Sequence, residues 1–311
     1  MAPRHRNTHR WLAALVLLAA PGCTGLPTAD MADDPIDAPL DEAVQSAVEV
    51  PAEVAKTARP SNDRDWIPLQ ARVATAEFHG NQVTIHNVRN TQFRTADDYT
   101  VRWQDRTYDL DKLTSLDFIV VPFPESPAIA HTMLSFGFEE RDYLDVSVET
   151  RKEKGEGYGT LAGVMNQYEI VYVLGDERDL IQLRTHHWMN DVYLYRTRAT
   201  PEEAREIFRD VMMRVNQLAI RPEFYNTLTN NCTTNIRSHI NKLFPDRIPY
   251  DYRVLFPGHS DALAYELGLL DTEDTFEHTR ERARINYLAY LYGDDPDFSV
   301  KIRQGILTAG R

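Results

Sequence analysis

The sequence predicts an α+β fold in which helices pack on an antiparallel sheet, and three observations support this class. Short segments with alternating apolar residues fill the first two thirds of the chain, as half-buried strands require. Segments with apolar residues every three or four positions dominate the last third. The 311 residues are 42% hydrophobic, so the chain can bury a sizeable core.

The predicted strands come first along the chain. The clearest hairpin joins residues 129–138 to residues 143–150 through a short charged turn centred near residue 140. A second hairpin is expected to join residues 71–78 to residues 82–89 around Gly80-Asn81. Residues 100–111 are expected to form another short pair of strands, and the remaining strand segments are 116–123, 169–174 and 191–196.

The predicted helices follow. The sequence Thr-Pro-Glu-Glu at residues 200–203 combines an N-cap, a first-turn proline and a capping glutamate, which predicts a helix to about Leu218. A second helix is expected to begin at Cys232, because Ile236, Ile240 and Leu243 share one face. Residues 260–269 and 278–292 are also expected to be helical.

The N-terminal region predicts export and anchoring. Residues 1–22 combine arginines with a short apolar run, as in a signal peptide, and Cys23 directly behind the run predicts lipidation. Residues 23–62 are rich in acidic residues and proline, so we expect a disordered tether. The folded domain is then expected over residues 63–270, with a helical C-terminal extension over residues 271–311.

The composition excludes several classes of protein. A formal net charge of −13 argues against nucleic-acid binding, which needs a basic face. Two cysteines are too few for a disulfide framework, a zinc ribbon or an iron–sulfur site. Because neither glycine-rich nucleotide-binding motif is present, and the acidic turn at residues 294–297 is short, we expect no cofactor and no metal.

One thiol is the candidate nucleophile. Cys232 lies in a polar stretch at the start of a predicted helix, where unpaired N–H groups and the helix dipole lower a thiol pKa. A small buried core residue is the alternative interpretation.

His131 is the candidate general base, because an unpaired imidazole among apolar strand residues would be costly; a structural core histidine is the alternative. If the hairpin turns at residue 140, Glu149 faces His131 and could orient the imidazole as the third member of a triad. A solvated charge or a partner of Arg151 is the other interpretation of Glu149. His239 follows Cys232 by two helical turns and is expected at the surface.

Six blocks of sequence together resemble a known family: residues 87–90, 130–136, 147–151, 175–179, 225–234 and 255–258. The order and content of these blocks resemble the N-terminal periplasmic domain family named after the lipoprotein N-acyltransferase Lnb. That family is similar to permuted papain-like thiol enzymes of the NlpC and lecithin:retinol acyltransferase type, in which the histidine strand precedes the cysteine helix. Lnb itself has a membrane-spanning region after this domain, and no such apolar segment occurs in residues 271–311.

The resemblance implies a function as well as a fold. It implies that Cys232 attacks the ester of a phospholipid, with His131 as base, and passes an acyl chain such as palmitate to the amine of a lipoprotein or another acceptor. It further implies oxyanion or substrate contacts from Asn231, Tyr225 and Arg151. The expected location is the bacterial envelope, lipid-anchored on the periplasmic face of the outer membrane.

Two other functions stay open at this stage. A thiol peptidase or amidase would need an open polar groove beside the thiol, whereas an acyltransferase would need an apolar slot. A non-catalytic envelope lipoprotein would not depend on Cys232 at all. Four arginines could recognise phosphate or carboxylate, but we favour internal ion pairs for them: Arg89, Arg151, Arg178 and Arg184.

Overall fold

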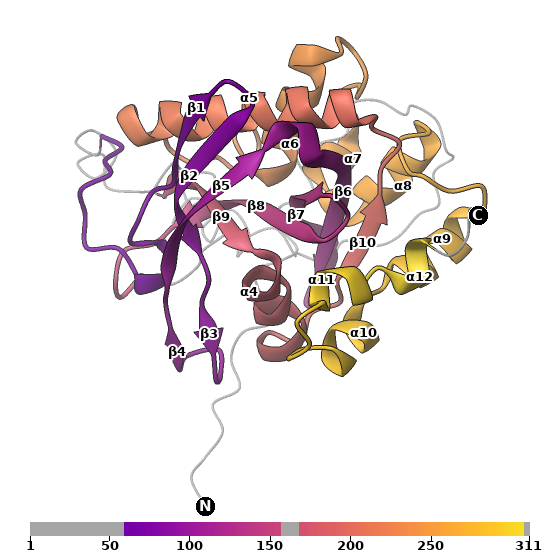
Figure 1. Ribbon diagram of the computed structural model, residues 1–311, viewed down its shortest axis with the longest axis horizontal. Coiled ribbons are helices and arrows are strands. Elements are labelled where there is room, and N and C mark those ends of the chain that lie inside the picture. Colours follow the sequence, from indigo (N-terminus) through magenta and orange to yellow (C-terminus); the bar gives the residue numbers. More distant parts are fainter. Residues whose placement is uncertain (1–58, 157–167, 308–311) are drawn as a thin grey trace, which may run out of the picture. The chain divides into compact units, whose positions relative to one another are not determined.

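The computed structural model describes residues 59–156 and 168–307. The predicted signal peptide, Cys23 and most of the predicted tether lie outside the described residues. The described residues form a mixed α+β structure with a mostly antiparallel sheet, which confirms the predicted fold class. Figure 1 shows helices on both sides of this sheet.

The main sheet has the strand order β1-β2-β9-β8-β7-β6-β10, and β5 pairs with β2. Neighbouring strands are antiparallel except β2 and β9, which run parallel. A separate two-stranded sheet joins β3 and β4. The strands are β1 (Thr75–His79), β2 (Gln82–Arg89), β3 (Gln92–Phe93), β4 (Tyr99–Thr100), β5 (Trp103–Asp109), β6 (Leu113–Phe123), β7 (Ser126–Phe138), β8 (Asp142–Arg151), β9 (Glu169–Asp176) and β10 (Tyr193–Arg196).

The longest helix, α5, begins with the predicted capping box. The predicted helix over residues 278–292 is interrupted, because Ile285 is buried and its N–H donates to the carbonyl of Val192. The helices are α4 (Glu177–Gln182), the π-helical η4 (Leu183–His187), α5 (Pro201–Ile220), α6 (Cys232–Leu243), α7 (Tyr252–Leu255), η5 (Pro257–His259), α8 (Ser260–Glu266), α9 (Phe276–Ala283), α10 (Asn286–Leu291), α11 (Phe298–Lys301) and α12 (Gln304–Leu307), with the 3₁₀ turns η2 (Pro68–Gln70) and η3 (Leu110–Lys112).

The two sides of the sheet are covered differently. Helices α5 and α6 cover one side over a large apolar core that includes Leu134, Phe136 and Phe208. Helices α4, α10 and α11 cover the other side over a smaller apolar cluster that includes Met133 and Ile302 (Figure 1). Successive residues of β7 therefore face opposite sides, as strand geometry requires.

The predicted hairpin of β7 and β8 opens at one end. Its pairing runs from Phe138–Asp142 to Met133–Ser147, so the turn is centred at residue 140 as predicted. No pairing between the two strands continues past Ser147, although β8 stays paired with β9 as far as Arg151. The start of β7 instead lies against η5, where a Cβ on Gly258 would come within 1.8 Å of the Pro127 carbonyl oxygen. Only glycine permits this approach, which helps to hold the beginning of β7 at the opening.

Candidate active site

Helix α6 places Cys232 at its first position. Asn231 caps the helix: its side chain accepts the Thr234 N–H at 2.8 Å, and the Thr234 hydroxyl accepts the Asn231 N–H at 2.8 Å. The N–H groups of the first helical turn have no acceptor within the helix. Cys232 is only 5% exposed, so its sulfur lies in a sheltered position beside these donors and the positive end of the helix dipole.

The imidazole of His131 lies against this thiol. Burial raises the pKa of Cys232, but a hydrogen bond and the charge interaction with His131 lower it more, and hydrogen bonds from Thr132 add to the effect. The net result is a Cys232 pKa of about 6. The Thr132 and Thr233 hydroxyls lie 3.0 Å apart and join β7 to α6 beside the sulfur. Cys232 is therefore largely a thiolate at neutral pH, which is the nucleophilic form.

A serine links His131 to a carboxylate. The Nε2 atom of His131 lies 2.7 Å from the Ser147 hydroxyl, and that hydroxyl donates to Glu149 at 2.8 Å. Because the single Ser147 proton goes to Glu149, the imidazole donates from Nε2, which leaves Nδ1 for the thiol. The expected direct contact of Glu149 with His131 is thus replaced by a chain through Ser147. Alternate residues of β8 share a face, and this periodicity was the available signal for Ser147.

Glu149 is held as an anion. Its carboxylate accepts hydrogen bonds from Arg184 at 3.1 Å and from Gln70 at 2.9 Å. Burial raises the pKa of Glu149, but the positive charges of Arg184, Arg89 and His131 outweigh burial and hold it at about 2. The carboxylate can therefore fix the tautomer and orientation of the imidazole at any physiological pH.

The remaining predicted contacts lie elsewhere or serve the fold. The side chain of Asn231 is used as the helix cap and donates to the Thr227 carbonyl, so it does not face a reacting group. Tyr225 packs, partly buried, against the core that includes Cys232. Arg151 makes internal contacts: its guanidinium donates to the Gln70 carbonyl at 3.0 Å and to Asn62, and lies over the Trp66 ring.

The arginines form internal contacts, as favoured from the sequence. Arg89 makes a two-point ion pair with Asp179, at 3.0 and 2.9 Å, and both are buried. Arg184 pairs with Glu149, and Arg178 donates to the Asp295 carbonyl. These arginines therefore stabilise the structure around the site. The expectation that His239 lies at the surface is wrong, because it is 5% exposed and fully hydrogen-bonded.

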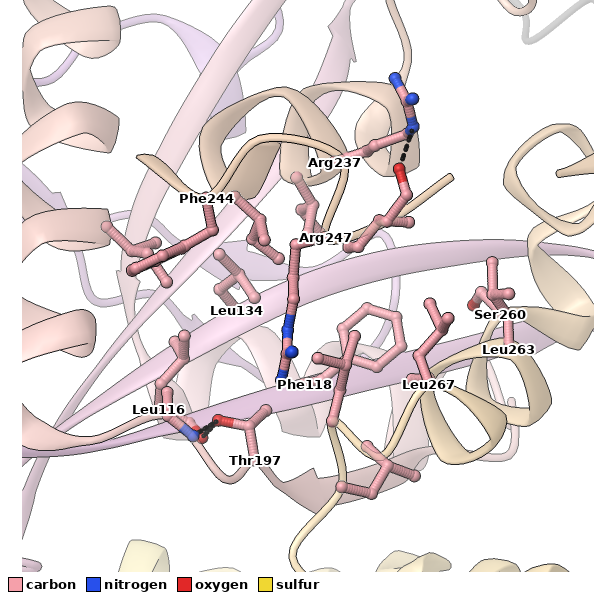
Figure 2. A pocket seen from close by; sticks show the side chains of 18 of the residues that line it. Leu116, Phe118, Leu134, Thr197, Arg237, Phe244, Arg247, Ser260, Leu263 and Leu267 are labelled. Carbon is pink, nitrogen blue, oxygen red and sulfur yellow. Dashed lines mark hydrogen bonds between the residues drawn. The ribbon is translucent and has the colours of Figure 1, made fainter. Parts of the chain in front are cut away.

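An apolar cavity of about 120 Å³ lies next to the start of α6, on the side of the sheet that α6 covers. Thr233, the neighbour of Cys232, forms part of its wall. Figure 2 shows Leu116, Phe118 and Leu134 of the sheet facing Phe244 and Leu263 across it. Arg247 reaches across the cavity (Figure 2) and makes no side-chain hydrogen bond or ion pair with the residues of 59–156 and 168–307. The cavity is an apolar slot, not an open polar groove.

Comparison with known families identifies the chain. The model of the Lnb N-terminal periplasmic domain matches residues 99–258. The chain belongs to this family. The matched residues of this Lnb-family chain include His131, Ser147, Glu149 and Cys232.

Comparison with curated proteins and with solved structures finds no match. Among the residues that the structure describes, no helix is both long and apolar enough to cross a membrane. The same residues contain no cluster of three or more histidine, cysteine or acidic side chains suited to a metal ion.

Proposed function

We propose that this Lnb-family domain transfers or hydrolyses acyl groups through a thioester on Cys232. The observation that carries this proposal is the continuous contact from the thiol through His131 and Ser147 to the ionised carboxylate of Glu149. This is the arrangement that nucleophilic catalysis needs: a nucleophile, a base within hydrogen-bond reach and a group that orients the base. The order of the histidine strand before the cysteine helix also fits a permuted papain-like fold.

Acylation would begin with the Cys232 thiolate. Its sulfur forms a bond to the ester carbon, and the carbonyl electrons move to the oxygen. The uncapped N–H groups of Cys232 and Thr233 are the donors available to hold that oxyanion. As the carbonyl re-forms, the ester C–O bond breaks, and the departing oxygen takes the proton from Nδ1 of the His131 imidazolium. The acyl group is then held as a thioester.

Transfer reverses the proton movement. An amine nitrogen attacks the thioester carbon and gives its proton to His131, and the C–S bond breaks to restore the thiolate. The product is an amide. With water in place of the amine, the same step gives a carboxylic acid. In both steps Ser147 and Glu149 hold the charged imidazole without taking its proton.

The cavity beside Thr233 favours an acyl chain over a peptide. Its wall consists mainly of aliphatic and aromatic side chains from β6, β7, α6 and α8. Burying methylene groups there is favourable by about 0.8 kcal/mol each, whereas the polar backbone of a peptide would lose its hydrogen bonds to water. A phospholipid is the proposed acyl donor, and a lipoprotein or another amine is the proposed acceptor. We further propose that lipidation at Cys23 anchors the domain to the periplasmic face of the outer membrane.

Mass spectrometry after incubation with phospholipid vesicles tests the thioester. The wild-type protein is expected to gain the mass of one acyl group on Cys232, and neutral hydroxylamine should remove it. Cys232→Ala should abolish the adduct, whereas Ser238→Ala, at an exposed position of the same helix, should leave it unchanged. An acyl adduct that persists in Cys232→Ala, or no adduct in the wild type, contradicts the proposal.

A second test asks whether the cavity selects the chain. Ile240 of α6 lines the cavity, and Ile240→Trp should fill part of its volume. We expect acylation by long-chain esters to fall about tenfold or more, while short-chain esters react at nearly the wild-type rate. An equal loss for all chain lengths would show that the cavity does not hold the chain. Measuring adduct formation across a series of ester donors of increasing chain length separates the two results.

A further inference from the structure

A buried histidine farther along the Cys232 helix is not used in the proposed reaction. His239 of α6 joins Asp210 of α5, at 2.8 Å from Nδ1, to the hydroxyl of Tyr172 of β9, at 2.8 Å from Nε2. The Tyr172 hydroxyl also donates to Asn235 of α6 at 2.9 Å. All four side chains are less than 10% exposed, so water cannot replace these hydrogen bonds cheaply.

The orientation of the amides in this network is fixed by backbone carbonyls, which can only accept. Asn230 donates from Nδ2 to the Phe224 carbonyl, so its Oδ1 is free to accept from Asn235. Asn235 donates from Nδ2 both to that oxygen and to the Asn231 carbonyl, at 2.9 and 2.8 Å. Its Oδ1 must therefore be the atom that faces Tyr172.

The proton count then decides the state of His239. The Tyr172 hydroxyl has one proton, and Asn235 Oδ1 receives it. Nε2 of His239 must therefore donate to the Tyr172 oxygen, and Nδ1 must donate to the carboxylate of Asp210. Both ring nitrogens carry protons only in the imidazolium form. The Asp210 pKa is lowered, chiefly by its hydrogen bond to His239, so an anion stands opposite this cation.

The network ends at the cap that positions Cys232. Asn235 binds the Asn231 carbonyl, and Asn231 is the N-cap residue directly before the nucleophile. If His239 lost a proton, Nε2 would become an acceptor and would compete for the single proton of Tyr172. Asn235 would then lose its donor, and the residues that hold the start of α6 would lose one support. The protonation state of His239 is thereby coupled to the position of the Cys232 sulfur.

We propose that His239 is a positioning residue that works as a buried imidazolium and holds the start of the Cys232 helix in its reactive place. As a statement about reactivity this rests on the proposed function, since it assumes that Cys232 is the nucleophile. The titratable and charged groups around the network are Asp210 and Arg214 from α5, Lys242 from α6, Tyr172 from β9 and Glu223, which pairs with Arg214. Asp210 is the acidic group in direct contact with the ring.

Two measurements without substrate test the proposal. Nitrogen-detected NMR of the histidine ring at pH 7 should show both nitrogens of His239 protonated; a neutral tautomer overturns the proposal. In Asp210→Asn, which removes the counter-charge, the same spectrum at pH 7 should show a neutral ring. Iodoacetamide alkylation of Cys232 should slow about tenfold in His239→Gln, since glutamine cannot donate at both ends. His79→Gln, at an exposed position, is the control and should change neither result.

The outcomes separate this proposal from the proposed function. A normal alkylation rate in a folded His239→Gln protein overturns the positioning role. If His239→Gln does not fold, Asp210→Asn decides: alkylation at pH 7 should slow when the spectrum shows a neutral ring, and an unchanged rate contradicts the coupling. If the NMR and alkylation results are as expected but no ester forms a thioester on Cys232, the proposed acyl transfer is contradicted and the positioning role of His239 is kept. If neither variant folds, the NMR result on the wild type still decides.

Discussion

The two sides of the sheet are stabilised by different interactions: apolar packing on one side and buried ion pairs on the other. The side under α5 and α6 is stabilised by apolar packing, in which Phe136 and Phe208 meet edge to face with ring centroids 5.1 Å apart. The side under α4 and α11 contains buried arginines, of which Arg303 is the most enclosed, at 0% exposure. The candidate site joins both: the thiol belongs to the apolar side, and the carboxylate that orients its imidazole belongs to the side with the ion pairs.

This difference explains how the Cys232 thiolate and the Glu149 carboxylate can both be ionised in one site. A thiolate and an anionic carboxylate in one apolar compartment would raise each other's pKa. Here Glu149 is compensated by Arg184 on one side of the sheet, while Cys232 interacts with His131, Thr132 and the helix dipole on the other. The end of pairing between β7 and β8 lets the imidazole connect the two compartments.

The largest expected effects compare the two sides directly. Arg303 donates to Asp117 and Glu177 at 2.6–2.8 Å. Among the described residues, Arg303→Ala would leave Asp117 with Arg196 alone and Glu177 with only the Ser135 hydroxyl, which should cost about 3–5 kcal/mol of unfolding free energy. Phe208→Ala should cost a similar ~3–5 kcal/mol through a cavity. Urea denaturation measures both, with Arg221→Ala, at an exposed position, as the control.

The pH dependence of these two losses separates the mechanisms. The penalty of Arg303→Ala should shrink at pH 4, where protonation can neutralise the carboxylates that lost Arg303. The penalty of Phe208→Ala should stay constant, because a cavity carries no charge. If the loss of unfolding free energy depended on pH equally in both variants, Arg303 would stabilise its side of the sheet by packing and not by its charge.

A smaller effect should come from breaking the link between the two compartments. Ser147→Ala removes the hydroxyl between His131 and Glu149, so the imidazole loses the group that fixes its tautomer. We expect kcat/KM for acyl transfer to fall by about 10- to 100-fold, with an unfolding free energy within about 1 kcal/mol of wild type. Ser238→Ala should leave kcat/KM unchanged. Full activity in Ser147→Ala would remove Glu149 from the mechanism.

Much of this arrangement could be predicted from local sequence. The start of α6 at Cys232, the hairpin centred at residue 140 and the capping box of α5 follow from short-range signals, and the structure has all three. The α+β class followed from the same periodicities. A polar residue directly before an apolar helical pattern is also a cap signal, so the capping role of Asn231 was within reach.

What could not be predicted depends on long-range partners. Arg303 lies 126 residues from Glu177 along the chain, and nothing near either residue indicates the other. The partners of Arg151 belong to residues 62–71, at the edge of the predicted domain, and no local signal links them to Arg151. The link through Ser147 was not predicted, because a direct carboxylate–imidazole contact fits the same register and only side-chain lengths decide between the two.

The smallest predicted effect is the pH dependence of the thiol. With a Cys232 pKa of about 6, the thiolate fraction should rise about tenfold from pH 5 to pH 7, and the rate of iodoacetamide alkylation should follow it. Glu149 stays ionised over this range because its pKa is about 2, so it adds no second step. His131→Gln should move the alkylation midpoint upward, toward the ordinary thiol value of about 8.5, because His131 is the main group that lowers it. A midpoint that stays near 6 in that variant would assign the low thiol pKa to the helix terminus and leave the imidazole without a role in ionising the sulfur.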